Sequence, residues 1–394
     1  MKKILYIFLG FFFLVLLGLI TYKIWWFYQS WPRRLEPELW SLDELETIPE
    51  DPAQNAWRFF EKSSDDWGDV LDDLPEELNS YAYDNYSDDS PDEFWRQAQE
   101  QRDALANYFE NSQNRHAAIL KNYEVLLGYS QFVDMSEPSF KKKSPRVINL
   151  LDLNRFARLY TLHLALQGEW QKNHAILLKQ LKQNIAWAYS ARSLLSQLAS
   201  LSSLQDNVEF LRLLKSRYPA ESWAEIEVLL RSIQWEQINL KKGIISEYYF
   251  QRNTVDTIDH DVQTQLDNSA RTLSPLFDIR RLRGIYRIWS YRWFNPNLLK
   301  NKINQRFISY QMALQNPTSI DEHFEENLRD PSFSNLGLRF SPNDSVLELL
   351  NIKLGKSIRE YYQKKEELKL KVQVLLSGTT PPQSLESQPV ETKP

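Results

Sequence analysis

The chain has 394 residues, no cysteine, and a formal net charge of −5 from 47 Lys and Arg against 52 Asp and Glu. Without cysteine, thiol nucleophiles and cysteine-ligated metal sites are excluded. An acidic chain whose sequence carries no basic, aromatic-rich stretch of its own disfavours nucleic acid as a partner.

Composition and patterning predict an all-α fold. Glycine is scarce, at 10 residues, whereas Leu, Gln, Glu, Lys, Arg and Ala, all good helix formers, are abundant. No sustained alternation of apolar and polar residues runs between tight turns, so the pattern of a sheet is missing from the sequence. We expect an N-terminal transmembrane helix followed by an irregular, repeat-like helical domain.

The first predicted element is a membrane anchor. The uncharged run Ile4–Tyr22 has 19 residues, and a helix of that length spans roughly 28 Å, close to the hydrocarbon core of a bilayer. Trp, Tyr and basic residues follow at once, as at the lipid headgroups, and no A-x-A-like cleavage site appears. The sequence therefore predicts an uncleaved signal anchor over residues 1–34.

The orientation of this anchor rests on a near tie. Lys2 and Lys3 lie before the apolar run, and Lys23, Arg33 and Arg34 lie after it. The lack of cysteine favours export, because exported proteins without disulfides have reason to avoid free thiols. We expect the short N-terminus inside and the bulk of the chain in the periplasm, on a bacterial inner membrane.

An acidic segment follows over residues 35–100. It holds 21 Asp and Glu against three basic residues, a balance of 3 − 21 = −18, whereas residues 101–394 hold 39 basic and 31 acidic residues, or +8. Such charge is typical of a solvated surface. Its many large rings, Trp57, Phe60, Trp67 and Trp95 among them, are unusual for a disordered tail, so we expect it to be partly ordered and packed on the more basic body.

Helix signals begin inside the acidic segment. Ser41 and Ser90 each have the Ser-x-x-Glu form of a capping box, and the second opens a predicted helix that passes through Phe94 and Phe109. Another predicted helix covers His116–Leu127. Residues 136–146 read as a loop, and the reading of its three lysines as a solvated turn is favoured over a lipid or polyanion contact.

The clearest pattern is a helical hairpin over residues 147–190. Apolar residues recur at helical spacing on both sides of a break at Gly168. The Gly168-x-Trp170 turn resembles that of a tetratricopeptide hairpin, in which glycine lets two helices cross closely. Asn173 stands where that repeat has alanine, and no second copy recurs at a 34-residue period. The sequence predicts one repeat-like hairpin.

The remaining helices complete a predicted domain over residues 101–376. They cover Ser193–Lys215, Ser222–Phe250 and, after a polar interruption at 251–265, two further stretches. One carries a ring stripe, more typical of a core than of a ligand cage, beside Arg280, Arg283 and Arg287; it stops at the Pro of "NPN", which starts another helix. A last helix passes Val346, Leu350, Ile358 and Tyr362, and residues 377–394 form a low-complexity tail predicted to be disordered.

Three of these stretches together resemble a group of bacterial membrane-anchored helical proteins. They are "LALQGEW", "FNPN" with its following helix, and the final "LLNIKLGKSIREYYQKKEELKLKVQVLL". The likeness extends over about Leu150 to Leu376. It implies an anchor and an all-α fold, and it implies no activity.

No catalytic motif or cofactor fingerprint is present, and no metal site is predicted. His163 and His174 flank Gly168 closely enough to meet across the hairpin, but ordinary helix histidines are favoured over a metal pair. Asp259, His260 and Asp261 form either a carboxylate–histidine dyad or, as we favour, a polar loop that caps a helix near Val262. The acidic stretch "YDNYSDDSPDE" lacks the Gly and Glu of a calcium loop.

Two functions are compatible with these features. The first is a single-pass anchored helical scaffold that binds another envelope protein. The alternative is a hydrolase of an envelope polymer or lipid that uses a carboxylate pair the sequence does not identify. The arginine stripe Arg280, Arg283 and Arg287 is the candidate interaction surface, for anionic headgroups or for the acidic segment of the same chain.

Overall fold

The computed structural model is all-helical in the residues it describes, which confirms the all-α part of the predicted fold class. Its only β feature there is an isolated parallel bridge between Asn55 and Gln131. The described residues are 10, 12–22, 34–45, 49–67, 70–83, 90–111, 113–136, 138, 147–272, 295–316 and 354–377.

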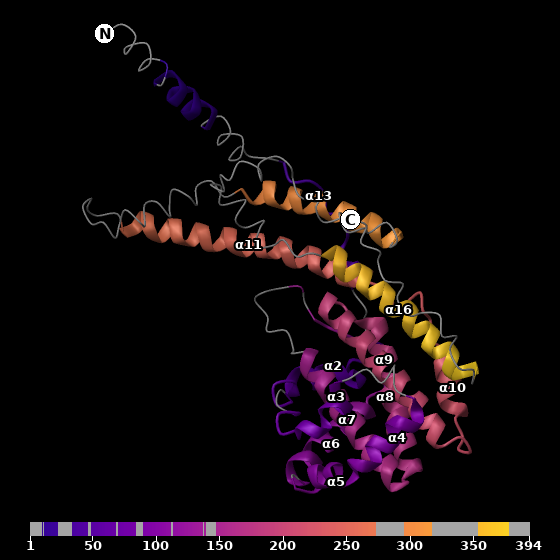
Figure 1. The fold of residues 1–394 in the computed structure, drawn as a ribbon. Coiled ribbons are helices and arrows are strands. Elements are labelled where there is room, and N and C mark those ends of the chain that lie inside the picture. Colours follow the sequence, from indigo (N-terminus) through magenta and orange to yellow (C-terminus); the bar gives the residue numbers. More distant parts are fainter. Residues whose placement is uncertain are drawn as a thin grey trace. The chain divides into compact units, whose positions relative to one another are not determined.

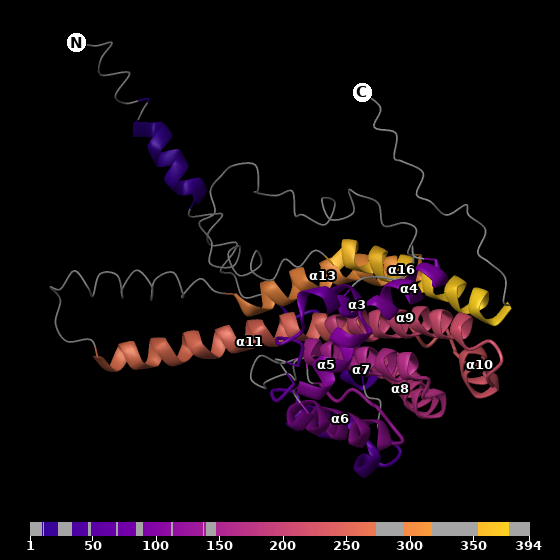
Figure 2. The ribbon, with the colours of Figure 1, turned by 60° about the horizontal axis from the view of Figure 1, so that its bottom comes forward.

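The chain divides into two compact units, each described by itself (Figures 1 and 2). Unit 1 comprises Met1–Leu42, Pro138–Lys141 and Glu247–Ser357. Unit 2 comprises Asp43–Glu137, Lys142–Ser246 and Ile358–Pro394. The predicted boundaries after residues 34, 100 and 376 stay predictions.

Unit 2 is centred on three long helices that pack side by side in both views. They are α7 (Val147–Gln167), α8 (Trp170–Ser190) and α9 (Leu194–Arg217). Shorter helices cover them, namely α2 (Ala56–Ser63), α3 (Asn79–Tyr83), α4 (Pro91–Glu100), α5 (Arg102–Asn111), α6 (Gln113–Gly128) and α10 (Ala224–Arg231). Three short 3-10 turns connect the N-terminal part, at η1 (Leu42–Leu45), η2 (Pro52–Gln54) and η3 (Glu76–Leu78).

The predicted hairpin at Gly168 is confirmed as α7 and α8. Gly168 has a positive φ of 81°, which glycine adopts without the steric cost of a Cβ. Its N–H donates to Ala165 O at 3.1 Å and the Glu169 N–H donates to Leu164 O at 3.0 Å. These two bonds form a Schellman motif, which satisfies carbonyls that the end of α7 leaves free.

Residues of the acidic segment are part of the core of unit 2. Trp57 and Phe60 of α2 are fully buried, with ring centroids 5.3 Å apart. Trp95 of α4 donates from its indole N–H to Leu213 O on α9 at 3.0 Å. Asp73 also forms an ion pair with Arg115 of α6. Apolar rings and polar pairs together hold this segment on the later helices.

Unit 1 contains most of α11 (Lys241–Thr272) and all of α13 (Pro296–Gln315), which run side by side in both views. The predicted helix start at "NPN" is confirmed, since the Asn295 side chain accepts from Leu298 N at 3.0 Å and Pro296 occupies the first turn. The last helix, α16 (Leu354–Ser377), lies largely in unit 2.

Three helix boundaries differ from the sequence prediction. The predicted helix 222–250 is wrong, because α10 ends at Arg231 and α11 begins at Lys241. The predicted polar interruption at 251–265 is wrong too, because α11 runs through it; polar residues such as the buried Gln251 and Arg252 are part of this helix. The helix through Phe94 and Phe109 is two helices that meet at Gln101.

The N-terminal helix is described over residues 12–22, and its apolar side chains are exposed, Phe13 by 68%. Within the described residues, no helix has both the length and the apolar character needed to cross a bilayer. Residues 1–9, Phe11 and residues 23–33 of the anchor predicted over 1–34 lie outside the described residues.

Candidate functional site

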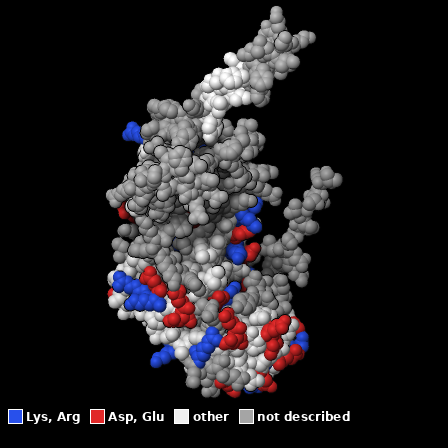
Figure 3. Space-filling view, turned by 90° about the vertical axis from the view of Figure 1, so that its left-hand side faces the viewer, with Lys and Arg blue, Asp and Glu red and all other residues white. Residues whose placement is uncertain are grey.

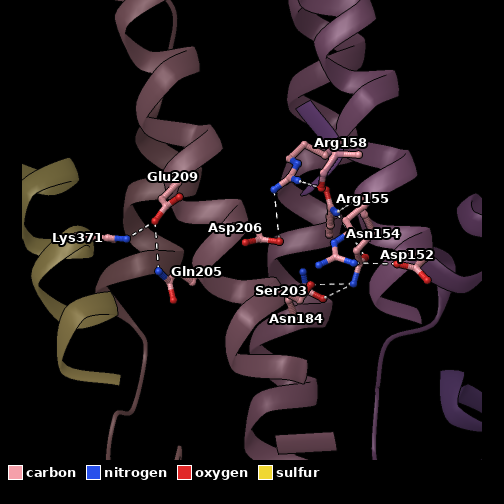
Figure 4. A network of polar contacts seen from close by, with 12 residues as sticks. Asp152, Asn154, Arg155, Arg158, Asn184, Ser203, Gln205, Asp206, Glu209 and Lys371 are labelled. Atoms are coloured by element: carbon pink, nitrogen blue, oxygen red, sulfur yellow. Dashed lines mark hydrogen bonds and ion pairs between the residues drawn. The ribbon is translucent and has the colours of Figure 1, made fainter. Parts of the chain in front are cut away.

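A buried polar network lies where α7, α8 and α9 meet in unit 2 (Figure 4). Its hub is Asn154 of α7, whose amide donates to Ser203 Oγ on α9 at 2.8 Å and to Asn184 Oδ1 on α8 at 3.3 Å. The Tyr123 hydroxyl of α6 donates to Asn154 Oδ1 at 3.0 Å. Burial raises the pKa of Tyr123 well above its ordinary value. One asparagine thus joins four helices.

Two basic residues of α7 extend this network. Arg158 is buried, lies 3.4 Å from Asp206 Oδ2 on α9, and donates to Ala82 O of α3. Arg155 pairs with Asp152 at 2.9 Å on its own helix. Burial raises the pKa of Asp206, and the cations Arg158 and Arg155 oppose that shift. Removing the Asp206 carboxylate from water therefore costs free energy, and the nearby cation Arg158 offsets part of that cost.

A second buried carboxylate lies one turn further along α9. Glu209 is buried, accepts from Gln205 at 3.3 Å, and forms an ion pair with Lys371 of α16, as Figure 4 shows. Lys215, also on α9, donates to Leu375 O of α16 at 3.0 Å and to Glu227 of α10 at 2.7 Å. These contacts attach α16 to α9 within unit 2.

Asp206 and Glu209 are two carboxylates of α9 that the sequence analysis did not single out. They stand at i and i+3 on α9, so they share one face of the helix. A carboxyl whose pKa is raised by burial can serve as a general acid. Each of the two nevertheless faces a cation inside a packed interface, which is the arrangement of a structural ion pair.

Another buried carboxylate organises the loop before α7. Asp134 accepts from Arg192 N and Ser136 N, both at 2.8 Å, and its own N–H donates to Ser190 Oγ at 3.2 Å. Ser190 Oγ in turn donates to Phe132 O at 2.7 Å. Asp134 thus connects the loop to the end of α8 through hydrogen bonds that stabilise the turn.

The two histidines of the hairpin join different aromatic clusters. His163 stacks on Phe109 with ring centroids 5.3 Å apart, and burial lowers its pKa. His174 lies against Trp170 at 5.5 Å, on a cluster that continues to Trp223. No group of three or more metal-ligating side chains occurs in the part of the chain that the structure describes. A metal pair at these histidines has no support.

A hollow of about 310 Å³ lies between α6 and α8 of unit 2. Its lining mixes apolar and charged residues, namely Glu124, Leu127, Lys172, Ala175, Ile176 and Lys179. A hydrogen bond with Tyr160 raises the pKa of Lys172. Figure 3 likewise shows Lys and Arg next to Asp and Glu on the face that it draws, without a large field of one sign among the described residues there.

In unit 1, residues 34–40 form an irregular segment held by α11 and α13. Side chains of Asn301 and Asn304 on α13 bind its backbone, and Tyr248, Tyr249 and Arg252 on α11 bind its backbone and Glu38. The ring of Trp40 packs edge-on against Tyr248 at 5.2 Å. We call this arrangement the clamp.

The residues singled out from sequence are distributed differently. Arg280, Arg283 and Arg287, the accompanying ring stripe and the three lysines at 141–143 lie outside the described residues. The predicted polar loop at "DHD", with its helix cap near Val262, is wrong, because Asp259 and His260 lie inside the continuous helix α11. The cap at Ser90 is confirmed, since its Oγ accepts from Glu93 N at 3.2 Å.

Sequence reasoning missed both the network and the clamp. The one available signal was asparagine inside helices, at Asn154 and at the i, i+3 pair Asn301 and Asn304, because asparagine disfavours helix interiors. A residue with poor helix propensity at a buried helical position indicates a polar partner.

Comparison with protein-family models, with curated proteins and with solved structures finds no match to the chain.

Proposed function

We propose that the protein is a single-pass, membrane-anchored helical scaffold of the bacterial envelope that binds another envelope protein. The carrying observation is the apolar helix of residues 12–22, whose large apolar side chains are exposed. A helix apolar on all sides is stable in lipid or against another protein. The uncharged run Ile4–Tyr22 is long enough for the former.

The clamp supports the anchoring part of this proposal. It fastens residues 34–40 to α11 and α13 only 11 residues, 23–33, after the exposed apolar helix. An anchor joined to a loose linker would leave the helical body far from the membrane. Here the clamp keeps unit 1 near the point where the chain leaves the lipid.

The interior of unit 2 supports a binding role over catalysis. Among the described residues of this unit, Glu209 and Asp134 are the buried carboxylates and Asp206 is half-buried, and each of the three is engaged by a cation or a backbone N–H. Helical hairpins that stack with such fixed interiors present rigid outer surfaces to partners. Affinity capture from detergent-solubilised membranes, with the full chain as bait, tests this role. Recovery of no partner above an untagged control argues against it.

Anchoring and orientation are tested by cysteine labelling, since the chain has no cysteine background. Ser387→Cys should react with a membrane-impermeant maleimide once the outer barrier is opened and the inner membrane is intact. Lys3→Cys is the matched control and should react only after lysis, because the proposal places it on the cytoplasmic side. An exposed thiol titrates near pH 8.5 on either side, so a difference between the two sites reports topology. The reverse pattern inverts the orientation, and a mature N-terminus beyond Tyr22 shows a cleaved signal.

A hydrolase acting on an envelope polymer or lipid is the second candidate, favoured by one observation. Asp206, whose pKa is raised by burial, and Glu209 share a face of α9. Replacing a catalytic acid commonly leaves stability intact or raises it, whereas replacing one partner of a structural pair lowers it. Asp206→Asn with unchanged thermal stability would therefore favour the enzyme.

A further inference from the structure

The clamp recognises the backbone of residues 34–40 through side chains. Asn301 makes a paired contact, since its Nδ2 donates to Arg34 O at 3.0 Å and its Oδ1 accepts from Glu36 N at 2.9 Å. Asn304 Nδ2 donates to Pro37 O at 2.9 Å. The Leu39 N–H donates to the Tyr248 hydroxyl at 3.2 Å. Backbone contacts of this kind are available to any segment that adopts the same conformation.

Two side chains of the segment add sequence selectivity. Glu38 accepts from the Tyr249 hydroxyl at 2.8 Å and lies 3.3 Å from Arg252 Nη2. The Trp40 ring meets Tyr248 at 5.2 Å and Phe307 at 6.2 Å, both edge-on. The clamp thus binds a carboxylate and, two residues later, a large aromatic ring.

The side chains of the clamp are fixed by one another. Asn304 Oδ1 accepts from the Tyr248 hydroxyl and from Arg252 Nη1, both at 2.7 Å. The Arg252 guanidinium also lies over the Tyr248 ring at 5.3 Å. All three residues are buried. Their mutual contacts do not involve residues 34–40, so the binding surface keeps its geometry when the segment leaves.

The segment itself lies on the surface. Residues 34–38 are exposed, Leu39 is half-buried, and Trp40 is the residue that inserts, with 6% of its surface exposed. Detachment of the segment removes one ring from the clamp and leaves the contacts between α11 and α13 in place. A segment with few buried contacts opens far more often than a whole unit unfolds.

We propose that the clamp is a peptide-binding site that exchanges residues 34–40 for a peptide of a partner protein, one with an acidic residue followed two residues later by Trp. The inference rests on the proposed binding role, and the exchange itself does not require that the apolar helix lies in a membrane. Exchange frees residues 34–40 and lengthens the tether between the apolar helix and the helical body. Partner binding and the reach of the protein from its anchor are thereby coupled.

The test uses the full chain in detergent and a fluorescent peptide with the sequence of residues 33–42. In the wild type the tethered segment competes with the peptide, so Trp40→Ala, which weakens the competitor, should bind the peptide at least tenfold more tightly. Trp40→Ala combined with Asn301→Ala should lose that gain. A peptide in which Trp is replaced by Ala is the matched control and should bind no variant.

Equal binding of the two peptides, or no binding to a Trp40→Ala chain with unchanged circular dichroism, overturns the proposal. If that variant does not fold, Glu38→Gln serves instead, because it weakens the segment without removing a ring. Wild-type protein gives a further readout, since excess peptide should speed hydrogen exchange at the Glu36 and Leu39 amides. Unchanged exchange also overturns the proposal, while partner capture through another surface leaves the broader function standing.

Discussion

The polar interior of unit 2 and the clamp of unit 1 are built from the same residue types but differ in what those residues bind. In unit 2, Asn154 and Arg158 bind side chains and carbonyls of neighbouring helices inside a packed core. In unit 1, Asn301 and Arg252 bind a segment, residues 34–40, that lies on the surface and is largely exposed to solvent. An asparagine or arginine on a helix therefore indicates a polar partner, and the burial of that partner distinguishes a fixed core from an exchangeable contact.

The difference has a thermodynamic consequence. A change in the core of unit 2 acts on the unfolding of the whole unit, whereas a change in the clamp acts first on the local docking of residues 34–40. Substitutions in the core of unit 2 should therefore lower the free energy of unfolding more than substitutions in the clamp.

Trp170→Ala should cause the largest loss. The Trp170 ring is buried between Tyr218 at 5.0 Å and Trp223 at 4.8 Å. Its removal should lower the free energy of unfolding by about 4 kcal/mol, as for large core rings. Denaturant titration followed by far-UV circular dichroism measures this, with the exposed Val228→Ala as a control of near-zero effect. A loss equal to that of Trp40→Ala would erase the contrast between core and clamp.

Arg158→Met should come next, at about 3 kcal/mol, because it leaves the half-buried Asp206 without the cation that pairs with it. Adding Asp206→Leu should restore part of the loss, since a well-packed apolar pair can replace a buried ion pair. The four proteins form a double-mutant cycle read by the same titration. Strict additivity of the two single changes would show that the pair is not coupled.

Gly243→Ala should destabilise unit 2 by about 1–2 kcal/mol through overpacking. Alanine normally stabilises a helix relative to glycine. Here a Cβ would lie 3.2 Å from Leu194 Cα and 3.0 Å from Gln197 Cδ on α9. Gln197 cannot move freely, because its Nε2 donates to Asn239 O at 2.9 Å. Gly128→Ala, where a Cβ meets nothing within 4 Å, is the matched control, and a stabilised Gly243→Ala protein contradicts the close approach.

The sequence was sufficient for whatever depends on local periodicity and end signals. Helix spacing around Gly168, the Ser90 cap and Asn295 before Pro296 each act within one or two turns, so their outcomes in the structure follow from neighbouring residues. The all-α class follows from the same signals summed over the chain.

Contacts between residues far apart in the chain could not be predicted from the sequence. The break at 232–240 and the continuity of α11 through Asp259 were both predicted wrongly, because polar residues are compatible with a helix as well as with a loop. Asp206 and Arg158 are 48 residues apart, and Asn301 and Arg34 are 267 apart. Such pairs depend on tertiary packing, which a single sequence does not encode in any local pattern.

Acid should weaken the aromatic cluster of α5, α6 and α7 in a defined window. Burial lowers the pKa of His116 and His163 below the unfolded value near 6.5. The unfolded state therefore binds protons first, and stability falls as the pH drops from about 6.5 towards the lowered folded values. His116→Phe should flatten this slope in thermal melts between about pH 7 and pH 5. An unchanged slope would show that His116 titrates alike in both states.

Glu38→Gln in the clamp should have the smallest effect on unfolding, about 0.5 kcal/mol or less, because half of the Glu38 side chain is exposed and its pair with Arg252 is screened by solvent. Arg252 keeps its bond to Asn304, so no buried charge loses its last partner. The same substitution should still raise hydrogen exchange at the Glu36 and Leu39 amides, since it weakens the docking of the segment. Arg96→Gln on α4 is a control for a solvent-exposed pair far along the chain. Loss of global stability as large as that of Arg158→Met would show that residues 34–40 are part of a core, and the exchangeable clamp would have to be abandoned.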